Sequence, residues 1–361
     1  MSLSILGLGT AVPEHSMLQS EALQMAHDFC CSTERQARLT KALYNRAGVD
    51  NRYTVLPYRI VYEWMKEGSG DDGASVGPLG PTTHQRMQFY EEHAFPLALR
   101  AVCGAIEDAS IDAREMTHLV TVSCTGFAAP GVDIALMTEL GLSPTIQRVH
   151  VGFMGCHGSI NAMRVAQAIG EADRAACILL CAVELCSLHY RFQWDPERFL
   201  GNALFADGAA ALVLRSDASC DAWSVSATGS CLLPESQDAM SWRIGDHGYE
   251  MTLSPRVSEL IHEHLRPWLS EWLKRQGTNL DEIGCWAVHP GGPRILKAVE
   301  SCLELAPDAT AVSHEILAKH GNMSSPTVLF ILDELCKKGA SPPCVVLGFG
   351  PGLVAEVALL S

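Results

Sequence analysis

Residues 149–169, VHVGFMGCHGSINAMRVAQAI, decide the fold class of this chain. The stretch begins with an apolar run that ends at Gly152, passes further glycines at positions 155 and 158, and continues into an amphipathic segment over residues 159–169. The apolar positions of that segment recur with the period of a helix. A strand that leads through a glycine-rich turn into a helix predicts layers of strands and helices, an α/β fold.

Apolar runs of strand length recur along the whole chain, with helical patterns between many of them. The nine runs cover residues 4–8, 119–122, 148–152, 177–183, 209–214, 223–227, 286–288, 344–347 and 354–360. A polar, glycine-rich stretch at 67–83 is expected to be a surface excursion. With 361 residues, 48% of them hydrophobic, the chain can bury the large core that such layers need.

The succession of elements occurs twice. Residues 105–124 give a helix, an apolar-acidic pair at 111–112 and a strand, and residues 268–289 give a helix, the same kind of pair at 280–281 and a strand. We therefore expect two similar halves, residues 1–218 and 219–361, joined around residues 216–221. Packing the halves together would bring their strand ends to a shared interface.

The charge and cysteine content exclude several classes of partner. With 26 basic and 41 acidic residues, the formal charge of −15 opposes binding to nucleic acid or to an anionic membrane. The longest apolar run, 175–183, is shorter than the roughly 18 residues of a membrane helix. Fourteen irregularly spaced cysteines in a large chain without a signal-peptide pattern are typical of free thiols. We expect a cytoplasmic protein with neither a nucleic-acid nor a membrane partner.

Cys156, His289 and Asn322 are candidate catalytic residues because each lies beside a glycine-rich turn near an apolar run. Cys156 precedes the predicted helix, whose dipole favours a thiolate. The HPGGP motif at 289–293 fixes its histidine at a strand-to-helix corner, with Pro293 suited to the first helical turn. A thiolate, an imidazole and an amide donor are the groups that covalent acyl transfer requires.

Each of the three has a structural alternative that the sequence leaves open. Cys156 also fits a buried core cysteine, His289 a structural turn, and Asn322 a cap on the helix predicted at 326–337. The GFGPG motif at 348–352 lacks the helix that follows a dinucleotide-binding loop, so it indicates a pocket wall or a hairpin.

Other chemistries find less support in the sequence. His262 and His264 point to different faces of a helix and no Cys-x-x-Cys pair occurs, so no metal site is expected. The Gly-x-Ser-x-Gly motif of serine hydrolases is absent. Asp207 precedes a strand and is expected to be a turn residue.

Taken together, these motifs resemble the type III polyketide synthases, the chalcone and stilbene synthase family within the thiolase superfamily. The resemblance spans essentially the whole chain. Its best segments are GC at 155–156, NALFADGAAA at 202–211, HPGGP at 289–293, GNMSS at 321–325 and GFGPG at 348–352. It implies a thiolase-like αβαβα layered fold made of two similar halves, an obligate homodimer, and a cytosolic enzyme with no tightly bound cofactor.

Carried over by position, the resemblance implies that Cys156 is the acyl-carrying nucleophile and that His289 and Asn322 promote decarboxylation of malonyl-CoA. Phe205 is similar to the aromatic residue that gates the passage between the coenzyme A tunnel and the cavity. An imidazolium at His289 is expected to lower the pKa of the Cys156 thiol, so that a thiolate exists at neutral pH.

The resemblance also implies a substrate cavity and a site for coenzyme A. The cavity residues are Cys124, Thr125, His189, Trp242, Met251, Ser324, Gly348, Phe349, Gly350 and Pro351. The cations expected to meet the coenzyme A phosphates are Arg38, Lys41, Arg46 and Arg294. For each of these cations a solvated surface charge is the alternative.

Several residues depart from the plant members of the family. His157 follows the nucleophile where plant enzymes have phenylalanine, and it is interpreted as a second titratable group or as a hydrogen-bonded turn residue. A cysteine at position 124 is similar to bacterial members. Ala129 stands where plant enzymes use a methionine that reaches into the partner subunit. Trp242 in place of a plant glycine would reduce the cavity, so the plant flavonoid product is not expected.

We expect an acyltransferase that loads an acyl-CoA starter on Cys156 and extends it by decarboxylative condensation with malonyl-CoA. Cyclisation to a pyrone, a resorcinol or a polyhydroxylated aromatic would follow. The alternatives are a ketoacyl-ACP synthase III-like enzyme that condenses once, and a non-catalytic acyl-CoA-binding protein. The starter, the number of extensions and the mode of cyclisation depend on cavity packing, which the sequence does not fix.

Overall fold

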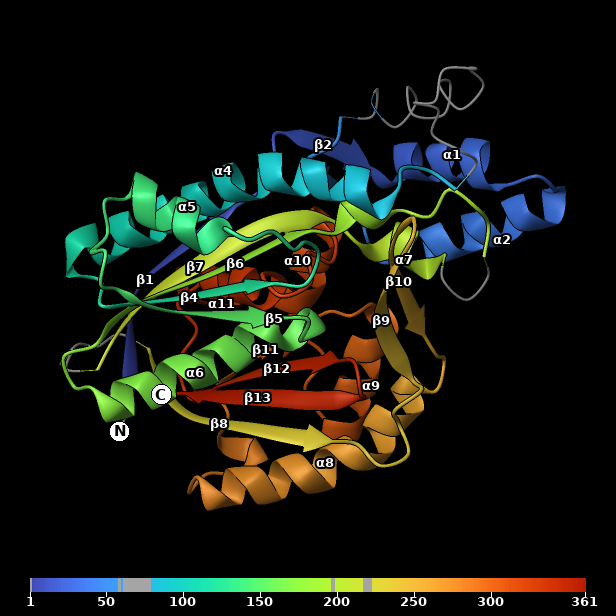
Figure 1. Cartoon of the computed structure of the whole chain (residues 1–361). Coiled ribbons are helices and arrows are strands. Elements are labelled where there is room, and N and C mark those ends of the chain that lie inside the picture. The colour runs from blue at the N-terminus through green and yellow to red at the C-terminus, as the bar shows by residue number, and fades with distance from the viewer. Residues whose placement is uncertain (1, 58–59, 61–78, 196–198, 217–222) are drawn as a thin grey trace.

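The computed structural model describes residues 2–57, 60, 79–195, 199–216 and 223–361 (Figure 1). Nine strands form one hydrogen-bonded sheet in the order β11-β12-β13-β8-β1-β7-β6-β4-β5. The strands are β1 (Leu3–Ala11), β4 (His118–Ser123), β5 (Gln147–Gly152), β6 (Cys177–Leu185), β7 (Asp207–Arg215), β8 (Ser224–Leu232), β11 (Cys285–Val288), β12 (Cys344–Gly350) and β13 (Val354–Leu360). Each of the nine apolar runs of the sequence coincides with one of these strands, so the strand prediction is confirmed.

The sheet has two halves, which meet at β1 and β8. These strands pair only through Leu3 with Val225 and Ser4 with Ser224. One half runs β1-β7-β6-β4-β5 and the other β8-β13-β12-β11. In both halves the first two pairings are antiparallel and the third is parallel. The internal repeat is therefore present in the topology. Of the predicted junction, residues 217–221 lie outside the described residues.

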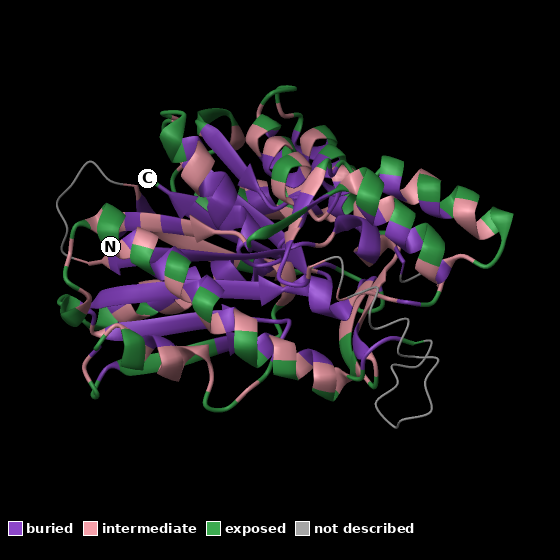
Figure 2. Cartoon of the chain, turned by 90° about the horizontal axis from the view of Figure 1, so that it is seen from above, coloured by how far each residue is buried: buried purple, intermediate pink, exposed green. Residues whose placement is uncertain are grey.

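Helices cover both faces of each half and complete five layers (Figure 1). The outer layers are α4 (Thr83–Ala109) with α5 (Val132–Glu139), and α8 (Val257–Arg275) with α9 (Pro293–Leu303); the central layer holds α6 (Gly158–Ala172) and α11 (Thr327–Lys337). In β6, Leu179 and Cys181 pack in the core cluster of α4, whereas Ile178 and Leu180 pack in that of α6 and α11. Figure 2 shows the strands buried beneath helices with exposed outer faces. The αβαβα architecture is thus confirmed.

Several smaller elements gather at one end of the sheet, on the right of Figure 1. They are α1 (Gln19–Cys30), α2 (Glu34–Asn45), α7 (Leu200–Leu204) and two small antiparallel sheets. One sheet pairs β2 (His15–Leu18) with β3 (Asn51–Thr54), on either side of α1 and α2 in the sequence, and the other is the hairpin of β9 (Met240–Gly245) with β10 (Gly248–Leu253). Neither small sheet was predicted from the sequence. Nearly all residues of β9 and β10 are partly exposed, so no apolar alternation marks them.

The remaining elements are short turns and one helix. α10 (Ala311–His320) packs against α11 and β3. The 3-10 turns η2 (Ala113–Glu115) and η5 (Leu280–Glu282) precede β4 and β11 at equivalent places in the two halves. The other two are η3 (Gly155–His157) and η4 (Cys186–His189).

The stretch expected to be a surface excursion, 67–83, lies outside the described residues as far as position 78, and its last residue begins α4. In the part of the chain that the structure describes, no helix combines the length and the apolar character needed to cross a bilayer.

Candidate active site

Cys156 lies at the junction between β5 and α6. The strand ends at Gly152, η3 carries Cys156, and α6 follows at once. Gly155 has a φ of +79°, and a Cβ at this position would lie 2.6 Å from Pro351 Cδ, so the turn requires glycine. The predicted strand, turn and helix are confirmed, and they place the thiol at the start of a helix.

Cys156 lines a cavity with about 390 Å³ of space between its walls, open solvent included. The predicted residues that share its lining are Cys124, Thr125, Phe205, Trp242, Met251, Ser324 and Pro351. Cys186, Met240 and Ser241 also line it and were not predicted. Segments separated by up to some two hundred residues in the sequence therefore meet around one thiol.

The hairpin of β9 and β10 forms one wall of this cavity. Trp242 Nε1 donates to the Cys124 carbonyl at 2.7 Å. The indole meets the rings of His189 and Tyr249 edge-on, with centroids 5.6 and 5.7 Å away. These contacts hold the indole against the cavity, in agreement with the expectation that Trp242 occupies space there.

His189 lies behind Trp242 and does not itself line the cavity. Its ring stacks on Tyr249 with centroids 4.2 Å apart. Nδ1 accepts from Tyr249 N at 3.0 Å, so Nε2 carries the proton and donates to the Thr125 carbonyl at 2.6 Å. Burial lowers the pKa of His189 to about 3, so the ring is neutral and supports the wall.

The Asn322 side chain has a fixed orientation. Its Oδ1 accepts from Ser324 N at 2.8 Å, which leaves the two N–H groups of Nδ2 free to face Cys156. Both Asn322 and Ser324 form side-chain hydrogen bonds with the sulfur. The helix α11 starts only at Thr327, so Asn322 does not cap it and that alternative is wrong.

The protonation state of Cys156 differs from the expectation. Burial raises the pKa of the thiol to about 11, the hydrogen bonds from Ser324 and Asn322 lower it only in part, and the charge of Glu184 raises it. Cys156 is therefore a thiol at neutral pH, and the expected resting thiolate is wrong. Removal from water outweighs the helix dipole here, although the residue as a whole is only half-buried.

His289 follows β11 and is 1% exposed. Its backbone N donates to the Leu347 carbonyl at 2.8 Å, and α9 begins at Pro293 as predicted. Neither ring nitrogen has a hydrogen-bond partner among the described residues. Burial, with a smaller contribution from His157, lowers the pKa of His289 to about 3. The ring is therefore a neutral imidazole, and the expected imidazolium is wrong for the resting state.

Glu184 is a buried carboxyl group that the sequence analysis did not assign. It ends an apolar run, and that was its only signal. Oε2 accepts from Cys124 N at 2.8 Å and from Thr125 Oγ1 at 2.7 Å, while Oε1 accepts from Ser325 Oγ at 2.6 Å. Burial raises its pKa to about 7. Glu184 therefore ties the cavity residues at 124–125 to the segment that carries Asn322.

Asp207 is the first residue of β7 and is fully buried, so the prediction of a turn residue is wrong. Its carboxyl oxygens accept from Ser187 N and Val55 N, both at 2.7 Å. Burial raises the pKa of Asp207 to about 6. Two backbone amides and a hydroxyl satisfy this carboxyl group, which is why it can occupy the core.

Arg52 is a second buried charged residue that sequence reasoning missed. It is 0% exposed, and its guanidinium donates to the carbonyls of Asn202 (2.6 Å), Ala203 (2.7 Å) and Phe205 (3.0 Å). These carbonyls belong to α7 and the residue that follows it. Arg52 therefore fixes the backbone that presents Phe205 to the cavity.

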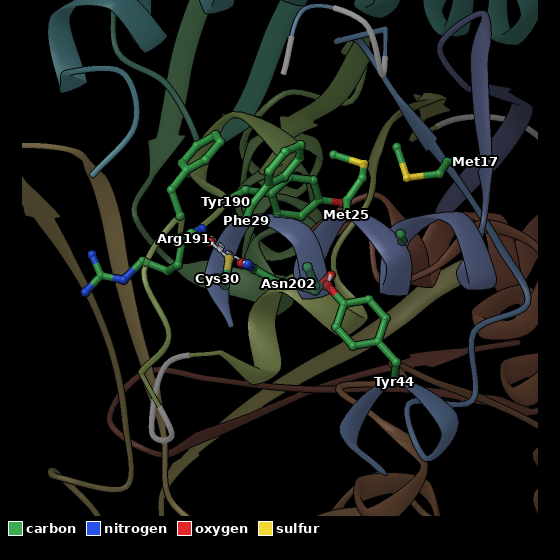
Figure 3. A pocket seen from close by; sticks show the side chains of 11 residues that line it. Met17, Met25, Phe29, Cys30, Tyr44, Tyr190, Arg191 and Asn202 are labelled. Carbon is green, nitrogen blue, oxygen red and sulfur yellow. Dashed lines mark hydrogen bonds between the residues drawn. The ribbon is translucent and has the colours of Figure 1, made fainter. Parts of the chain in front are cut away.

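A second crevice lies where α1 and α2 meet α7 (Figure 3). Tyr44 Oη donates to the Asn202 carbonyl at 3.2 Å, and Cys30 Sγ to the Arg191 carbonyl at 3.1 Å. The Asn202 carboxamide exchanges two hydrogen bonds with the Arg191 backbone, at 2.8 and 3.0 Å. None of the proposed catalytic residues lines this crevice. Its contacts attach α1 and α2 to α7.

Three predicted cavity residues lie behind the wall. Gly348 and Gly350 are buried in β12, where they face His157, and Phe349 packs in the core between β12 and α8. Only Pro351, at the end of the GFGPG motif, reaches the cavity lining. The motif ends β12 and leads into β13, so its hairpin interpretation is correct as well.

The four predicted coenzyme A cations are all exposed. Arg38 and Lys41 lie on α2, Arg46 caps its C-terminal end, and Arg294 is the second residue of α9. A Cβ on Gly48 would lie 2.6 Å from Pro293 Cγ, so the end of α2 lies against the start of α9. The structure pairs none of the four with a described carboxylate. Arg46 and Arg294 therefore lie at neighbouring helix ends, the C-terminal end of α2 and the N-terminal end of α9.

No group of three His, Cys, Asp or Glu side chains among the described residues could hold a metal ion. All thirteen described cysteines are free.

Comparison with known proteins places this fold and cavity in a family. Residues 2–218 match the N-terminal domain of the chalcone and stilbene synthases, and residues 224–361 match the C-terminal domain. The chain is 33% identical to 1,3,6,8-tetrahydroxynaphthalene synthase of Streptomyces peucetius subsp. caesius, over 99% of this chain and 92% of that protein. It is 30% identical to the alpha-pyrone synthesis polyketide synthase-like Pks18 of Mycobacterium tuberculosis, over 97% of this chain and 88% of that protein.

A solved structure agrees with these similarities. The crystal structure of PKS-I from the brown alga Ectocarpus siliculosus superposes with a TM-score of 0.91 at 28% identity, covering 99% of this chain and 98% of that chain. The fold is that of the thiolase-like condensing acyltransferases. The chain belongs to the chalcone and stilbene synthase family, the type III polyketide synthases. This family uses coenzyme A thioesters as substrates and no bound cofactor.

Proposed function

We propose that this enzyme loads an acyl group from a coenzyme A thioester onto Cys156 and extends it with malonyl-CoA. One observation carries the proposal. Cys156 lines the cavity and its sulfur receives side-chain hydrogen bonds from Asn322 and Ser324, so a nucleophile and oriented donors lie at one cavity.

In this proposal, loading starts from a neutral thiol. As the sulfur attacks the thioester carbonyl, its proton passes to a ring nitrogen of His289. The carbon–sulfur bond to coenzyme A then breaks, and the leaving thiolate takes the proton. Both ring nitrogens of His289 are buried and have no hydrogen-bond partner in the described part of the chain, which supports a role as temporary proton acceptor. If His289 were only a turn residue, burying its ring without a hydrogen bond would destabilise the fold and nothing would compensate for it.

Decarboxylation of malonyl-CoA supplies the carbon nucleophile. The bond between its carboxylate and its α carbon breaks, carbon dioxide leaves, and the electron pair forms an enolate on the thioester oxygen. N–H groups of Asn322 and His289 stabilise that oxygen. The enolate carbon attacks the acyl carbonyl on Cys156, the carbon–sulfur bond breaks, and the chain has gained two carbons; the sulfur leaves as a thiolate and takes up one proton from water to restore the thiol. The hydrogen bond from Ser324 N to Asn322 Oδ1 supports this step, because it directs Nδ2 toward the sulfur.

Coenzyme A would enter past Phe205, with its phosphates near the junction of α2 and α9. Arg46 and Arg294 lie at the two ends that meet there, and neither has a described carboxylate partner. Two unpaired cations at one junction supply the local positive charge that an acidic protein needs in order to bind an anionic substrate.

The product proposed is a small cyclised polyketide: a pyrone, a resorcinol or a polyhydroxylated aromatic. Two similar proteins carry names that refer to an alpha-pyrone and to tetrahydroxynaphthalene. Trp242, anchored to the Cys124 carbonyl, restricts the cavity and favours a compact product.

A homodimer is proposed through the edge strand β5. This strand ends the sheet order, and its first four residues are exposed. Exposed apolar side chains surround it, namely Phe127 (68%), Val149, Phe153 and Met154. A second copy would cover this patch and the open edge together. Light scattering on purified protein tests this, and Val149→Glu is expected to shift the mass toward the monomer. The free cysteines support a reducing, cytoplasmic setting.

The activity is tested by incubating the protein with malonyl-CoA and a panel of aromatic and short- to long-chain acyl-CoAs, with products read by mass spectrometry. Products extended by more than one two-carbon unit and cyclised are expected. A single extension on an acyl carrier protein would instead identify a ketoacyl synthase. A radiolabelled acyl adduct that forms in the wild type and is lost in Cys156→Ala is expected. Persistence of condensation in Cys156→Ala would overturn the proposal.

A further inference from the structure

His157, the residue after Cys156, is a buried imidazole for which the reaction above provides no role. Its side chain is 3% exposed. Nδ1 lies 2.7 Å from Asn161 Oδ1, one turn along α6. A carboxamide oxygen only accepts, so in the neutral ring the proton is on Nδ1 and the lone pair is on Nε2. Nε2 is buried and has no hydrogen-bond partner among the described residues.

The glycines of β12 provide the space for this ring. A Cβ on Gly350 would lie 2.5 Å from both Cδ2 and Nε2 of His157, and a Cβ on Gly348 would lie 3.2 Å from His157 Cβ. Side chains at these two positions would collide with the imidazole or displace it. Gly348 and Gly350 of the GFGPG motif therefore leave room for the imidazole of His157, the residue after the nucleophile.

The same strand brings His157 close to His289. The His289 backbone N donates to the carbonyl of Leu347, the residue before Gly348. A charge on His157 lowers the pKa of His289, and the two rings are not hydrogen-bonded to each other in this structure. Three ring nitrogens, one of His157 and two of His289, are buried without a hydrogen-bond partner among the described residues. Native proteins leave few buried polar atoms unpaired, and those that remain call for an explanation.

We propose that His157 is a positioning residue for His289, and that its Nε2 lone pair accepts a hydrogen bond from His289 during loading of Cys156. Asn161 fixes the tautomer of His157, and His157 fixes the orientation of the His289 ring. The thiol proton moves from sulfur to one nitrogen of His289, while the N–H on the other nitrogen points to His157. The proton then leaves with the coenzyme A thiolate, so none is gained or lost. This inference rests on the role proposed above for Cys156.

Charged groups from three elements surround His157 and predict its pH behaviour. Glu356 on β13 favours the protonated ring, whereas Arg164 on α6, together with burial, opposes it; His289 adjoins it from the end of β11. Glu356 is itself held by Arg164 and by Ser230 Oγ at 2.8 Å. The neutral ring has the lone pair that the proposal needs. Protonation at acid pH would remove the lone pair and place a like charge beside the imidazolium of His289.

Two variants of His157 separate this role from packing. His157→Phe keeps a ring of similar size and lacks a lone pair. His157→Gln presents an amide N–H toward Asn161 and an oxygen toward His289, so it retains the acceptor. The measurements are the rate constant for alkylation of Cys156 by iodoacetamide and the single-turnover rate of acyl loading, both as a function of pH.

His157→Phe is expected to lower both rates by about tenfold or more, the effect of one charge-assisted hydrogen bond, and to remove an acidic limb from the pH profile. His157→Gln is expected to recover most of the rate at neutral pH and also to lack that limb. A packing role alone would give the opposite order, because phenylalanine fills the site better than glutamine.

Unchanged rates and an unchanged pH profile in a folded His157→Phe protein would overturn the inference. If His157→Phe does not fold, the comparison of Asn161→Leu with Asn161→Asp tests the inference instead. Only the aspartate variant retains an acceptor for His157 Nδ1. The leucine variant is expected to be slower, and equal rates would overturn the inference. Cys156→Ala distinguishes a failure of the proposed function from a failure of the role proposed for His157. If it still condenses, the proposed function fails; if it is inactive while the variants at 157 and 161 behave as wild type, only the role of His157 fails.

Discussion

Phe205 and Asn322 are joined by a short parallel β-bridge. Asn322 N donates to the Leu204 carbonyl at 2.9 Å, and Ala206 N donates to the Asn322 carbonyl at 2.9 Å. The candidate gate residue and the candidate amide donor come from opposite halves of the chain, yet their backbones are fixed relative to each other. Arg52 extends this unit, since its guanidinium holds the carbonyls on either side of Leu204.

Replacing Arg52 tests how strongly this unit depends on one buried cation. Arg52→Met removes three charge-assisted hydrogen bonds to buried carbonyls, each of which keeps one neutral donor, from Tyr44, Gln19 or Tyr190, so we expect a loss of about 3 kcal/mol or more in the free energy of unfolding. Gln19→Leu removes one acceptor of the guanidinium and the two hydrogen bonds that Gln19 Nε2 donates to the Tyr44 and Ala203 carbonyls, and it should cost less because the guanidinium and its carbonyl acceptors stay in place. Urea titration measures both. Equal midpoints for the Arg52→Met protein and the wild type would contradict the assignment.

Asn322→Ala should slow decarboxylation of malonyl-CoA by on the order of 10²-fold, while acylation of Cys156 persists. Asn322→Asp is the matched control, because aspartate keeps the acceptor for Ser324 N and loses the N–H donors. Both variants are expected to be equally slow in release of labelled carbon dioxide. An aspartate variant with wild-type rates would show that orientation of the loop, and not the donor, is what matters.

Trp242→Ala should enlarge the cavity and admit longer starters or further extensions, because the indole lines the cavity beside Cys124. Trp242→Phe retains most of the volume and removes only the hydrogen bond to the Cys124 carbonyl. Product masses from the acyl-CoA panel provide the readout. We expect heavier products from the alanine variant only; identical product profiles for all three proteins would show that Trp242 does not limit the chain.

Glu184 makes stability depend on pH in a defined direction. Burial raises its pKa from 4.5 to about 7, so the folded protein holds the proton more tightly than the unfolded chain does. The stabilisation from this proton is fully present below pH 4.5 and is lost as the pH rises to about 7.

Glu184→Gln isolates that contribution from the other titrating groups. The free energy of unfolding of the wild type, relative to Glu184→Gln, should decrease between pH 4.5 and 7 and then level off. Thermal or urea unfolding of both proteins at several pH values measures the difference. A difference that is constant across this range would mean that the carboxyl group has an ordinary pKa.

Arg294→Ala should raise the Michaelis constant for malonyl-CoA by about fivefold, the equivalent of about 1 kcal/mol for one exposed charge contact, with little change in turnover. Lys297→Ala removes another exposed cation from the same helix and serves as the control. The effect should weaken as salt is added. Equal constants for the two variants would identify Arg294 as a solvated surface charge.

The extent to which the sequence predicts this protein differs between fold and site. The nine strands could be predicted because each is an apolar run, and the turn at Gly155 because its backbone conformation requires glycine. The hairpin of β9 and β10 could not, because its mostly half-buried residues show no apolar alternation and it is held by contacts to distant residues such as that of Trp242 with Cys124. Arg52 and Asp207 were missed for a related reason: charged residues in a sequence suggest surface until their partners are known.

By itself, the sequence determined the layered α/β fold and the internal repeat and singled out three candidates for acyl transfer, because periodicity, glycine turns and motif spacing are local properties of the chain. Only the tertiary structure decided the protonation states of Cys156 and His289, the direction of the Asn322 amide and the seat of His157 against β12. The physical reason is that desolvation and hydrogen-bond geometry depend on which remote segments enclose a group. A cysteine at a solvated helix N-terminus would favour the thiolate. In the folded protein Cys156 is a thiol, because burial raises its pKa.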